Sequence, residues 1–194
     1  MRKKLWILIP ALMILLMASA CKTKIYSGNT FALDTLIELK IYQNSGRENG
    51  DDLIQESFDL VRTLEDMLSV HVEGSDIYNL EQNAGVQPTR VNALTYRVLQ
   101  DSLYFSEITD GLFDITAGPL INLWAIDPPD GHYPSPEELD EVLPLIDYHK
   151  IDFLGDNQVE LQEKGMIVNL GAIAKGTIAD EVKAFLVEKC LSFP

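Results

Sequence analysis

The stretch MIVNLGAIAKGTIADEV, residues 166–182, joins a short apolar run, a loop between two glycines and the start of a helix. Residues 166–170 are apolar except for Asn169, as expected of a buried strand. Thr177 is predicted to cap the helix, with Asp180 at the reciprocal capping position. The apolar stripe of this helix consists of Ile178, Val182, Phe185 and Leu186. The stretch therefore predicts a strand–loop–helix unit.

The loop GAIAKG, residues 171–176, is a candidate anion site. A loop that opens a helix presents backbone N–H groups and the positive end of the helix dipole, which suit a phosphate. Lys175 adds a cation. The spacing matches neither G-x-x-x-x-G-K-[ST] nor G-x-G-x-x-G. The loop alone therefore leaves a phosphate site and an ordinary tight turn both open.

A second informative stretch, GLFDITAGPLINLW, covers residues 111–124 and places Asp114 and Thr116 among apolar neighbours. A carboxylate in such a setting must be paired or hydrogen-bonded if it is buried. Asp114 either lines a ligand site or caps the turn beside Gly118. Trp124 belongs either to the core or to a stacking surface. The stretch could thus be a buried strand and turn, or one wall of a ligand site.

The remaining chain mixes helices and hairpins without regular strand–helix alternation, which indicates the α+β class, a mixed sheet with flanking helices. The expected elements are a strand over 31–42, a helix from about Ile54 to Leu68, an irregular stretch over 69–85, a helix over 93–109, a helix capped by Ser135 with Pro136 and Glu138, and a hairpin over 150–162 that turns at 155–157.

The N-terminus reads MRKKLWILIPALMILLMASA and is followed by Cys21. A basic start, a short apolar run and small residues are typical of a secretory signal, and the ending resembles a lipoprotein processing site at Cys21. Residues 1–20 are thus predicted to be a lipoprotein signal peptide, and residues 21–30 a polar tether. An uncleaved membrane anchor is the alternative, although the apolar run falls short of the roughly 20 residues that a span needs.

Charge and composition exclude several classes of function. The net charge is −15, and removal of residues 1–20, which carry three cations and no acids, would bring it to −18. Nonspecific nucleic-acid binding, which needs cations, is excluded. Beyond Cys21 the only other cysteine is Cys190, and three scattered histidines show no zinc spacing. His71 could serve a hydrolase, but no G-x-S-x-G elbow is present, and a structural histidine is the simpler interpretation.

Four segments in this order resemble the ApbE family: FALDTLIELKIY, LSVHVEGSDIYNL, DGLFDITAGPLINLW and IVNLGAIAKGTIADEV. This family consists of exported, often lipid-anchored flavin transferases, which use FAD and Mg²⁺ to attach FMN to Thr or Ser of target flavoproteins. The resemblance spans residues 31 to about 189. It implies a T-fold-like architecture, a flavoprotein acceptor as partner, and a location on the outer or periplasmic side of a bacterial membrane, anchored through Cys21.

The resemblance also implies site residues. The segment Leu112-Phe113-Asp114 matches residues that line the FAD pocket. Ala172 matches a residue whose oxygen helps to hold the metal, a role open to a backbone carbonyl. Leu33 takes the place of a family Met that lies near the flavin, and His71 takes the place of an aromatic residue that lies against the flavin ring. Asn169 stands where the family usually has an Asp, and Lys175 matches a residue that contacts FAD.

The chain departs from the family pattern after Lys189. The family continues with a His-x-x-Asp-Pro-x-Thr-Gly stretch and with acidic and Thr residues that complete the Mg²⁺ site, whereas this sequence closes with EKCLSFP. We therefore expect residues 31–194 to be the N-terminal portion of a truncated flavin transferase domain. Because one backbone oxygen does not hold Mg²⁺, little or no FMN transfer by this chain is expected.

Three functions remain open from the sequence. The first is an FAD:protein FMN transferase, represented by its N-terminal portion. The second is an exported flavin-binding lipoprotein without catalysis. The third is a nonfunctional fragment, which would melt without cooperativity and without stabilisation by FAD. Covalent transfer of flavin to an acceptor distinguishes the first from the other two.

Overall fold

The computed structural model describes residues 24–43, 49–125 and 131–191. The chain divides into two compact units. The first unit contains the described residues up to Asp59 together with those from Phe185 onward, and the second contains residues 60–184. The predicted signal peptide and the lipidation site Cys21 lie outside the described residues.

The first unit is built on an antiparallel hairpin of β1 (Lys24–Ala32) and β2 (Thr35–Gln43). Leu33 and Asp34 connect the strands with φ values of 53° and 55°, the left-handed pair typical of a tight hairpin turn. The prediction of one strand over 31–42 is therefore wrong. Leu is an unusual residue at positive φ, so a turn at Leu33 was not expected from the residue pattern.

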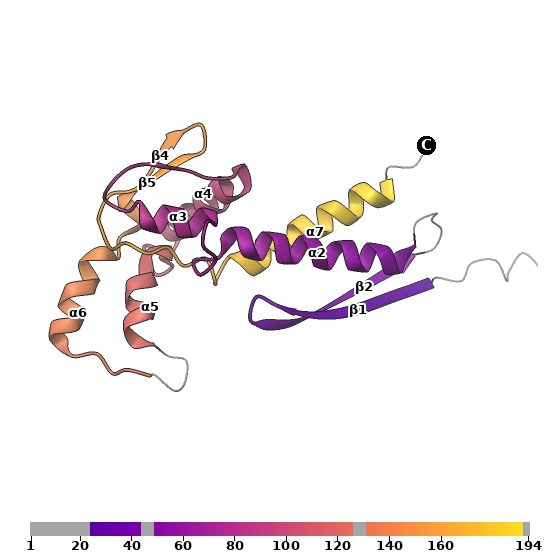
Figure 1. Cartoon of the computed structure of the whole chain (residues 1–194), viewed down its shortest axis with the longest axis horizontal. Coiled ribbons are helices and arrows are strands. Elements are labelled where there is room, and N and C mark those ends of the chain that lie inside the picture. The colour runs from indigo at the N-terminus through magenta and orange to yellow at the C-terminus, as the bar shows by residue number, and fades with distance from the viewer. Residues whose placement is uncertain (1–23, 44–48, 126–130, 192–194) are drawn as a thin grey trace, which may run out of the picture. The chain divides into compact units, whose positions relative to one another are not determined.

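The predicted tether is also corrected, because the residues from Lys24 to Thr30 lie in β1. Its polar residues alternate with β-formers, and Tyr26 is buried. Tyr26 packs with Ile54 and Phe58 of α2 (Gly50–Leu68), in the part of this helix up to Asp59 that belongs to the first unit and lies along the hairpin in Figure 1. The inner side chains of β2 that join this cluster are only partly buried: Ile37, Leu39 and Ile41.

The second unit contains the remaining elements. They are α3 (Asp76–Gln82), β3 (Thr89–Arg90), α4 (Ala93–Ile108), the 3-10 turn η1 (Ile115–Ala117), α5 (Gly118–Trp124), α6 (Pro136–Val142), the 3-10 turns η2 (Leu143–Leu145) and η3 (Tyr148–Lys150), β4 (Ile151–Gly155), β5 (Gln158–Leu161), and α7 (Ala174–Leu191), whose last residues belong to the first unit. The sheet order is β3-β5-β4, with antiparallel pairs. The α+β class is thus confirmed.

Several local predictions for the second unit are confirmed. The hairpin over 150–162 is β4 and β5, and the helix over 93–109 is α4. The cap of α6 is a complete capping box: Ser135 accepts from the N–H of Glu138, and the Glu138 carboxylate accepts from the N–H of Ser135. Strong local signals therefore decided these elements.

Other local predictions are wrong. The stretch over 69–85 contains α3, capped by Ser75, whose side chain accepts from Tyr78 N–H. The stretch around Gly118 forms η1 and α5 where a strand and turn were considered. Pro119 sits in the first turn of α5, where its missing N–H costs no hydrogen bond.

The strand–loop–helix unit is also corrected. α7 begins at Ala174, so Thr177 lies inside the helix and does not cap it. Residues 166–170 alternate between buried and half-buried side chains, as in a strand, with Met166, Val168 and Leu170 buried. No strand of the described part of the chain pairs with them in a ladder. The alternation of side chains over residues 166–170 predicted a strand, but no strand among the described residues pairs with this segment.

Candidate functional site

A groove of about 490 Å³ lies in the second unit. Its lining comes from α4, from the segment before η1 and from the start of α7: Asp101, Phe105, Thr109, Phe113, Ala172, Ile173, Gly176, Thr177 and Asp180. Two of the residues predicted from the family resemblance, Phe113 and Ala172, therefore line one groove although they lie far apart in the sequence.

The α4 wall follows helical geometry. Asp101, Phe105 and Thr109 are spaced four residues apart, so they lie on one face. The Thr109 hydroxyl donates to the carbonyl of Phe105 (2.7 Å) and accepts from the N–H of Phe113 (3.1 Å). The rings of Phe105 and Phe113 meet edge to face, with centroids 6.3 Å apart. Thr109 thus fixes the backbone that places Phe113 in the groove.

The α7 wall begins at a turn held by Asn169. Its side-chain oxygen accepts from the N–H of Gly171 (2.9 Å), and its own N–H donates to the carbonyl of Ile115 (2.8 Å). The N–H groups of Ile173 and Ala174 both donate to the carbonyl of Leu170 and start the helix. A hydrogen-bonded ion pair between Arg97 and Glu181 links α4 to α7. The Asn169–Ile115 hydrogen bond therefore joins the segment before α7 to η1, and the Arg97–Glu181 ion pair joins the two helices.

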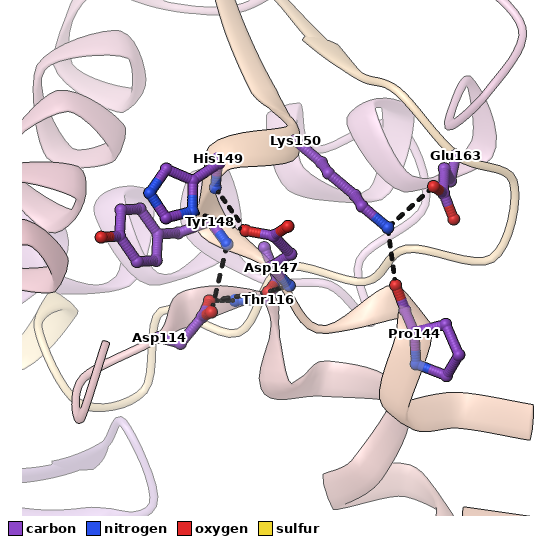
Figure 2. A network of polar contacts seen from close by, with 8 residues as sticks. All are labelled: Asp114, Thr116, Pro144, Asp147, Tyr148, His149, Lys150 and Glu163. Carbon is purple, nitrogen blue, oxygen red and sulfur yellow. Dashed lines mark hydrogen bonds and ion pairs between the residues drawn. The ribbon is translucent and has the colours of Figure 1, made fainter. Parts of the chain in front are cut away.

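Asp114 sits beside the groove and caps η1 (Figure 2). Its Oδ1 accepts from the N–H of Thr116 (2.7 Å) and from the Thr116 hydroxyl (2.6 Å), and its Oδ2 accepts from the N–H of Tyr148 (3.1 Å). The Thr116 hydroxyl in turn accepts from the N–H of Asp147 (2.8 Å). Both carboxylate oxygens thus serve the backbone, which is the capping role that the sequence had left as one alternative.

The same network continues into η3. His149 Nδ1 lies 2.8 Å from Asp147, and its ring stacks on that of Tyr148 with centroids 4.0 Å apart. The His149 side chain, more than any other group, lowers the pKa of the Asp147 carboxyl. Lys150 donates to the carbonyl of Pro144 and pairs with Glu163 (Figure 2). This network joins the segment before η1 to η3.

The other predicted site residues differ in position. Lys175 is exposed in the first turn of α7, between the lining residues Ile173 and Gly176. Asn169 holds the turn behind the groove and does not line it. The side chain of Leu112 is 92% exposed and is also outside the lining. The roles of these residues toward a flavin stay predictions.

His71 and Leu33 lie elsewhere. His71 is exposed in the bend before α3. Burial raises the pKa of the nearby Glu81 above its usual value, and His71 opposes part of this rise. Glu81 lines a second, smaller groove of about 240 Å³. Leu33 occupies the β1–β2 turn, in the first unit. The groove in the second unit is lined without either residue.

Three residues of α4 that line the groove were not predicted as site residues from the sequence. Asp101, Phe105 and Thr109 on α4 were seen only as part of a helix. The available signal was the i, i+4, i+8 spacing of an acid, an aromatic residue and a threonine on one helix face. It could have suggested a polar–apolar wall, but nothing in α4 alone indicates that α7 lies opposite.

The described residues do not by themselves form a magnesium site. No group of three or more His, Cys, Asp or Glu side chains is placed to hold a metal ion within the part of the chain that the structure describes. Ala172 can offer only a backbone carbonyl, whereas Mg²⁺ favours an octahedral oxygen shell that includes carboxylates.

The elements described above define an α+β protein with a partly aromatic groove between α4 and α7. The model of the ApbE family matches residues 33–192, and the chain belongs to this family. It is 30% identical over 87% of its length to an FAD:protein FMN transferase of Klebsiella pneumoniae, and 28% identical over 86% to one of Treponema pallidum.

The fold agrees with a solved relative. The structure of the flavin transferase ApbE from Vibrio cholerae matches 87% of this chain with a TM-score of 0.80 at 24% identity, which shows the shared fold. The chain spans about half the length of the curated relatives it matches, 53% and 48% for the two named above, and 55% of the solved chain.

Proposed function

We propose that the chain takes part in FAD:protein FMN transfer and that its groove holds the flavin portion of FAD. The observation that carries this proposal is the joint lining of one groove by Phe113 and Ala172, within a chain of the ApbE family. A flavin ring is large, planar and mostly apolar, so it suits a wall that offers Phe105 and Phe113.

The groove also carries charges that would orient such a ligand. Lys175, exposed beside the lining, is the cation nearest in sequence to Ala172, and a phosphate would favour its side of the groove. Asp101 and Asp180 line the groove and would repel a phosphate. The ring is therefore proposed to lie along Phe105 and Phe113, with the pyrophosphate directed toward the first turn of α7, beside Lys175 and at the positive end of the helix dipole.

Magnesium is proposed as the metal ion of the transfer reaction. When bound, Mg²⁺ neutralises charge on the pyrophosphate during phosphoryl transfer. The carbonyl of Ala172 would supply one ligand, and no group of three or more His, Cys, Asp or Glu side chains among the described residues is placed to complete the site. Transfer of FMN to Thr or Ser of a flavoprotein acceptor by this chain alone is thus proposed to be weak.

The experiment that tests the proposed function has two readouts. Equilibrium dialysis with FAD in the absence of Mg²⁺ measures binding, and incubation with FAD, Mg²⁺ and an acceptor flavoprotein, followed by in-gel fluorescence, measures covalent transfer. Binding with weak transfer supports the proposal. No binding of FAD at millimolar concentration would contradict it.

A flavin-binding lipoprotein without catalysis is the second candidate, favoured by the lack of a metal-binding cluster among the described residues. Reversible FAD binding combined with no detectable transfer, even at long incubation, would support it.

We also propose export and lipid anchoring at Cys21. None of the described helices is long and apolar enough to span a bilayer. Replacement of Cys21 by Ser should abolish incorporation of labelled palmitate if the anchor is correct.

A further inference from the structure

Thr109 lies where α4 ends and the chain reverses its direction toward the groove. It is the C-cap of α4, and the two residues after it, Asp110 and Gly111, have φ values of 53° and 76°. The N–H of Gly111 donates to the carbonyl of Ser106 at 2.9 Å, which is the outer bond of a Schellman-type helix end. This reversal brings the residues after Gly111 back to the last turn of α4.

The hydroxyl of Thr109 contacts both aromatic residues of this wall. It accepts from the N–H of Phe113 at 3.1 Å and donates to the carbonyl of Phe105 at 2.7 Å, with a longer contact of 3.3 Å to the carbonyl of Ser106. A hydroxyl has a single hydrogen, so Thr109 has none left to donate to a ligand. Its polar group therefore serves the backbones of Phe105 and Phe113.

The rings of Phe105 and Phe113 meet each other directly. Their planes make an angle of 74° and their centroids are 6.3 Å apart, an edge-to-face pair. Such a pair depends on the relative position of its rings, because the positive edge of one ring faces the negative face of the other. Both residues line the groove together with Thr109. A shift of the Phe113 backbone would therefore change the aromatic surface that the groove offers.

A separate anchor holds the chain after Phe113. The carboxylate of Asp114 accepts from the N–H groups of Thr116 and Tyr148, which fixes this part of the segment to η1 and η3. The N–H of Phe113 itself is held by Thr109. Phe113 is only half-buried, so water can reach the N–H in part once this acceptor is removed. We therefore expect loss of the Thr109 hydroxyl to move Phe113 locally while the second unit stays folded.

We propose that Thr109 is a positioning residue for flavin binding, which sets the Phe113 ring against Phe105 and donates no hydrogen bond to the flavin. This inference rests on the proposed function, because it assigns the two rings to the flavin. Every atom that takes part belongs to one continuous stretch, residues 105–113. The arrangement is thus complete within the described part of the chain.

Two replacements separate the hydroxyl of Thr109 from its methyl group. Thr109→Val keeps the shape and removes the hydroxyl, whereas Thr109→Ser keeps the hydroxyl and removes the methyl group. In the full chain without FAD, amide exchange at Phe113 should be at least about tenfold faster in Thr109→Val and close to the original in Thr109→Ser. Nuclear Overhauser effects between the rings of Phe105 and Phe113 should weaken in Thr109→Val alone. Both readouts need no ligand.

FAD titration then tests the role toward the flavin. Thr109→Val should weaken binding about fivefold, because one hydrogen bond that places Phe113 is lost, and Thr109→Ser should restore it. Thr30→Val makes the same chemical change on β1, in the first unit, and should bind FAD like the original. The double variant Thr109→Val/Phe113→Ala should bind no more weakly than Phe113→Ala, because Thr109 acts through that ring.

The outcomes separate the inference from the proposed function. Unchanged exchange at Phe113 in Thr109→Val would overturn the positioning role. Equally weak FAD binding by Thr109→Ser would overturn it as well and assign a flavin contact to the methyl group, as would an undiminished effect of Thr109→Val in the Phe113→Ala background. If the original chain binds no FAD while exchange at Phe113 responds as expected, the proposed function and the role toward the flavin fail, and the placement of Phe113 by Thr109 stands.

Discussion

The N–H of Asn169 donates to the carbonyl of Ile115 at 2.8 Å and thereby joins the two stretches that form the groove. Phe113 lies two residues before this carbonyl, and Ala172 three residues after this N–H. Both Ile115 and its neighbour Thr116 are buried, so the joint is shielded from water. The groove therefore depends on the packing of two segments that each looked ambiguous in the sequence.

Gly118→Ala should destabilise the second unit. An added Cβ would lie 2.5 Å from the carbonyl oxygen of Ile167, a backbone atom that cannot rotate away. We expect a loss of about 1–3 kcal/mol in the free energy of unfolding, as for other overpacked sites. Gly176→Ala is the matched control, because no neighbour lies near its added Cβ and Ala favours a helix. Urea unfolding measures both, and equal stability of the two variants would contradict the account.

Asp114→Ala should loosen the segment beside the groove. It leaves the N–H groups of Thr116 and Tyr148 without their carboxylate acceptor, at a cost of about 2 kcal/mol. Asp114→Asn keeps one acceptor oxygen and should lose less. Amide hydrogen exchange at Thr116 and Tyr148 provides the measurement. Unchanged protection at both amides in Asp114→Ala would show that the capping role is misassigned.

Phe113→Ala should weaken FAD binding at least about tenfold, because it removes an aromatic wall of the groove. Leu154→Ala is the control, since Leu154 is exposed at the end of β4 and lies outside the groove lining. Fluorescence quenching of FAD during titration gives both dissociation constants. The proposal fails if the two variants bind FAD equally well.

Lys175→Gln should show whether Lys175 contacts the pyrophosphate or the ring of FAD. We expect about fivefold weaker binding of FAD, because a cation at the first turn of α7 is lost. Riboflavin, which lacks phosphate, should bind the variant and the original alike. Lys183→Gln, a change of the same charge farther along α7, should leave both ligands unaffected. A parallel loss of FAD and riboflavin binding would mean that Lys175 contacts the ring.

The cap of α6 should weaken in acid. The N–H of Ser135 and then the His132 side chain hold the pKa of Glu138 below its usual 4.5. Since the folded pKa is the lower one, the stabilisation is present above about pH 4.5 and is lost as pH falls through the folded value. Protection factors of α6 amides at pH 6 and pH 3 should show this loss. Glu138→Gln should flatten the difference, whereas Glu137→Gln should retain it.

The sequence predicted elements whose signals are local. The capping box of Ser135 and Glu138 predicted the start of α6. The turn formers Gly155, Asp156 and Asn157 predicted the β4–β5 turn, where all three residues have positive φ. The turn at Leu33 was missed because its first residue is not a turn former. Tertiary packing determines the groove, and no pattern within α4 predicts that Arg97 will meet Glu181 on α7. Phe113 and Ala172 were named through family resemblance, which carries such long-range information.

The most direct test of the central claim is an NMR titration of the ¹⁵N-labelled chain with FAD. The account predicts that amide shifts concentrate at Thr109, Phe113, Ala172 and Gly176, while those of the smaller groove, such as Val86 and Lys164, stay unchanged. Shifts confined to the smaller groove, or no shifts at millimolar FAD, would contradict the claim that this groove holds the flavin.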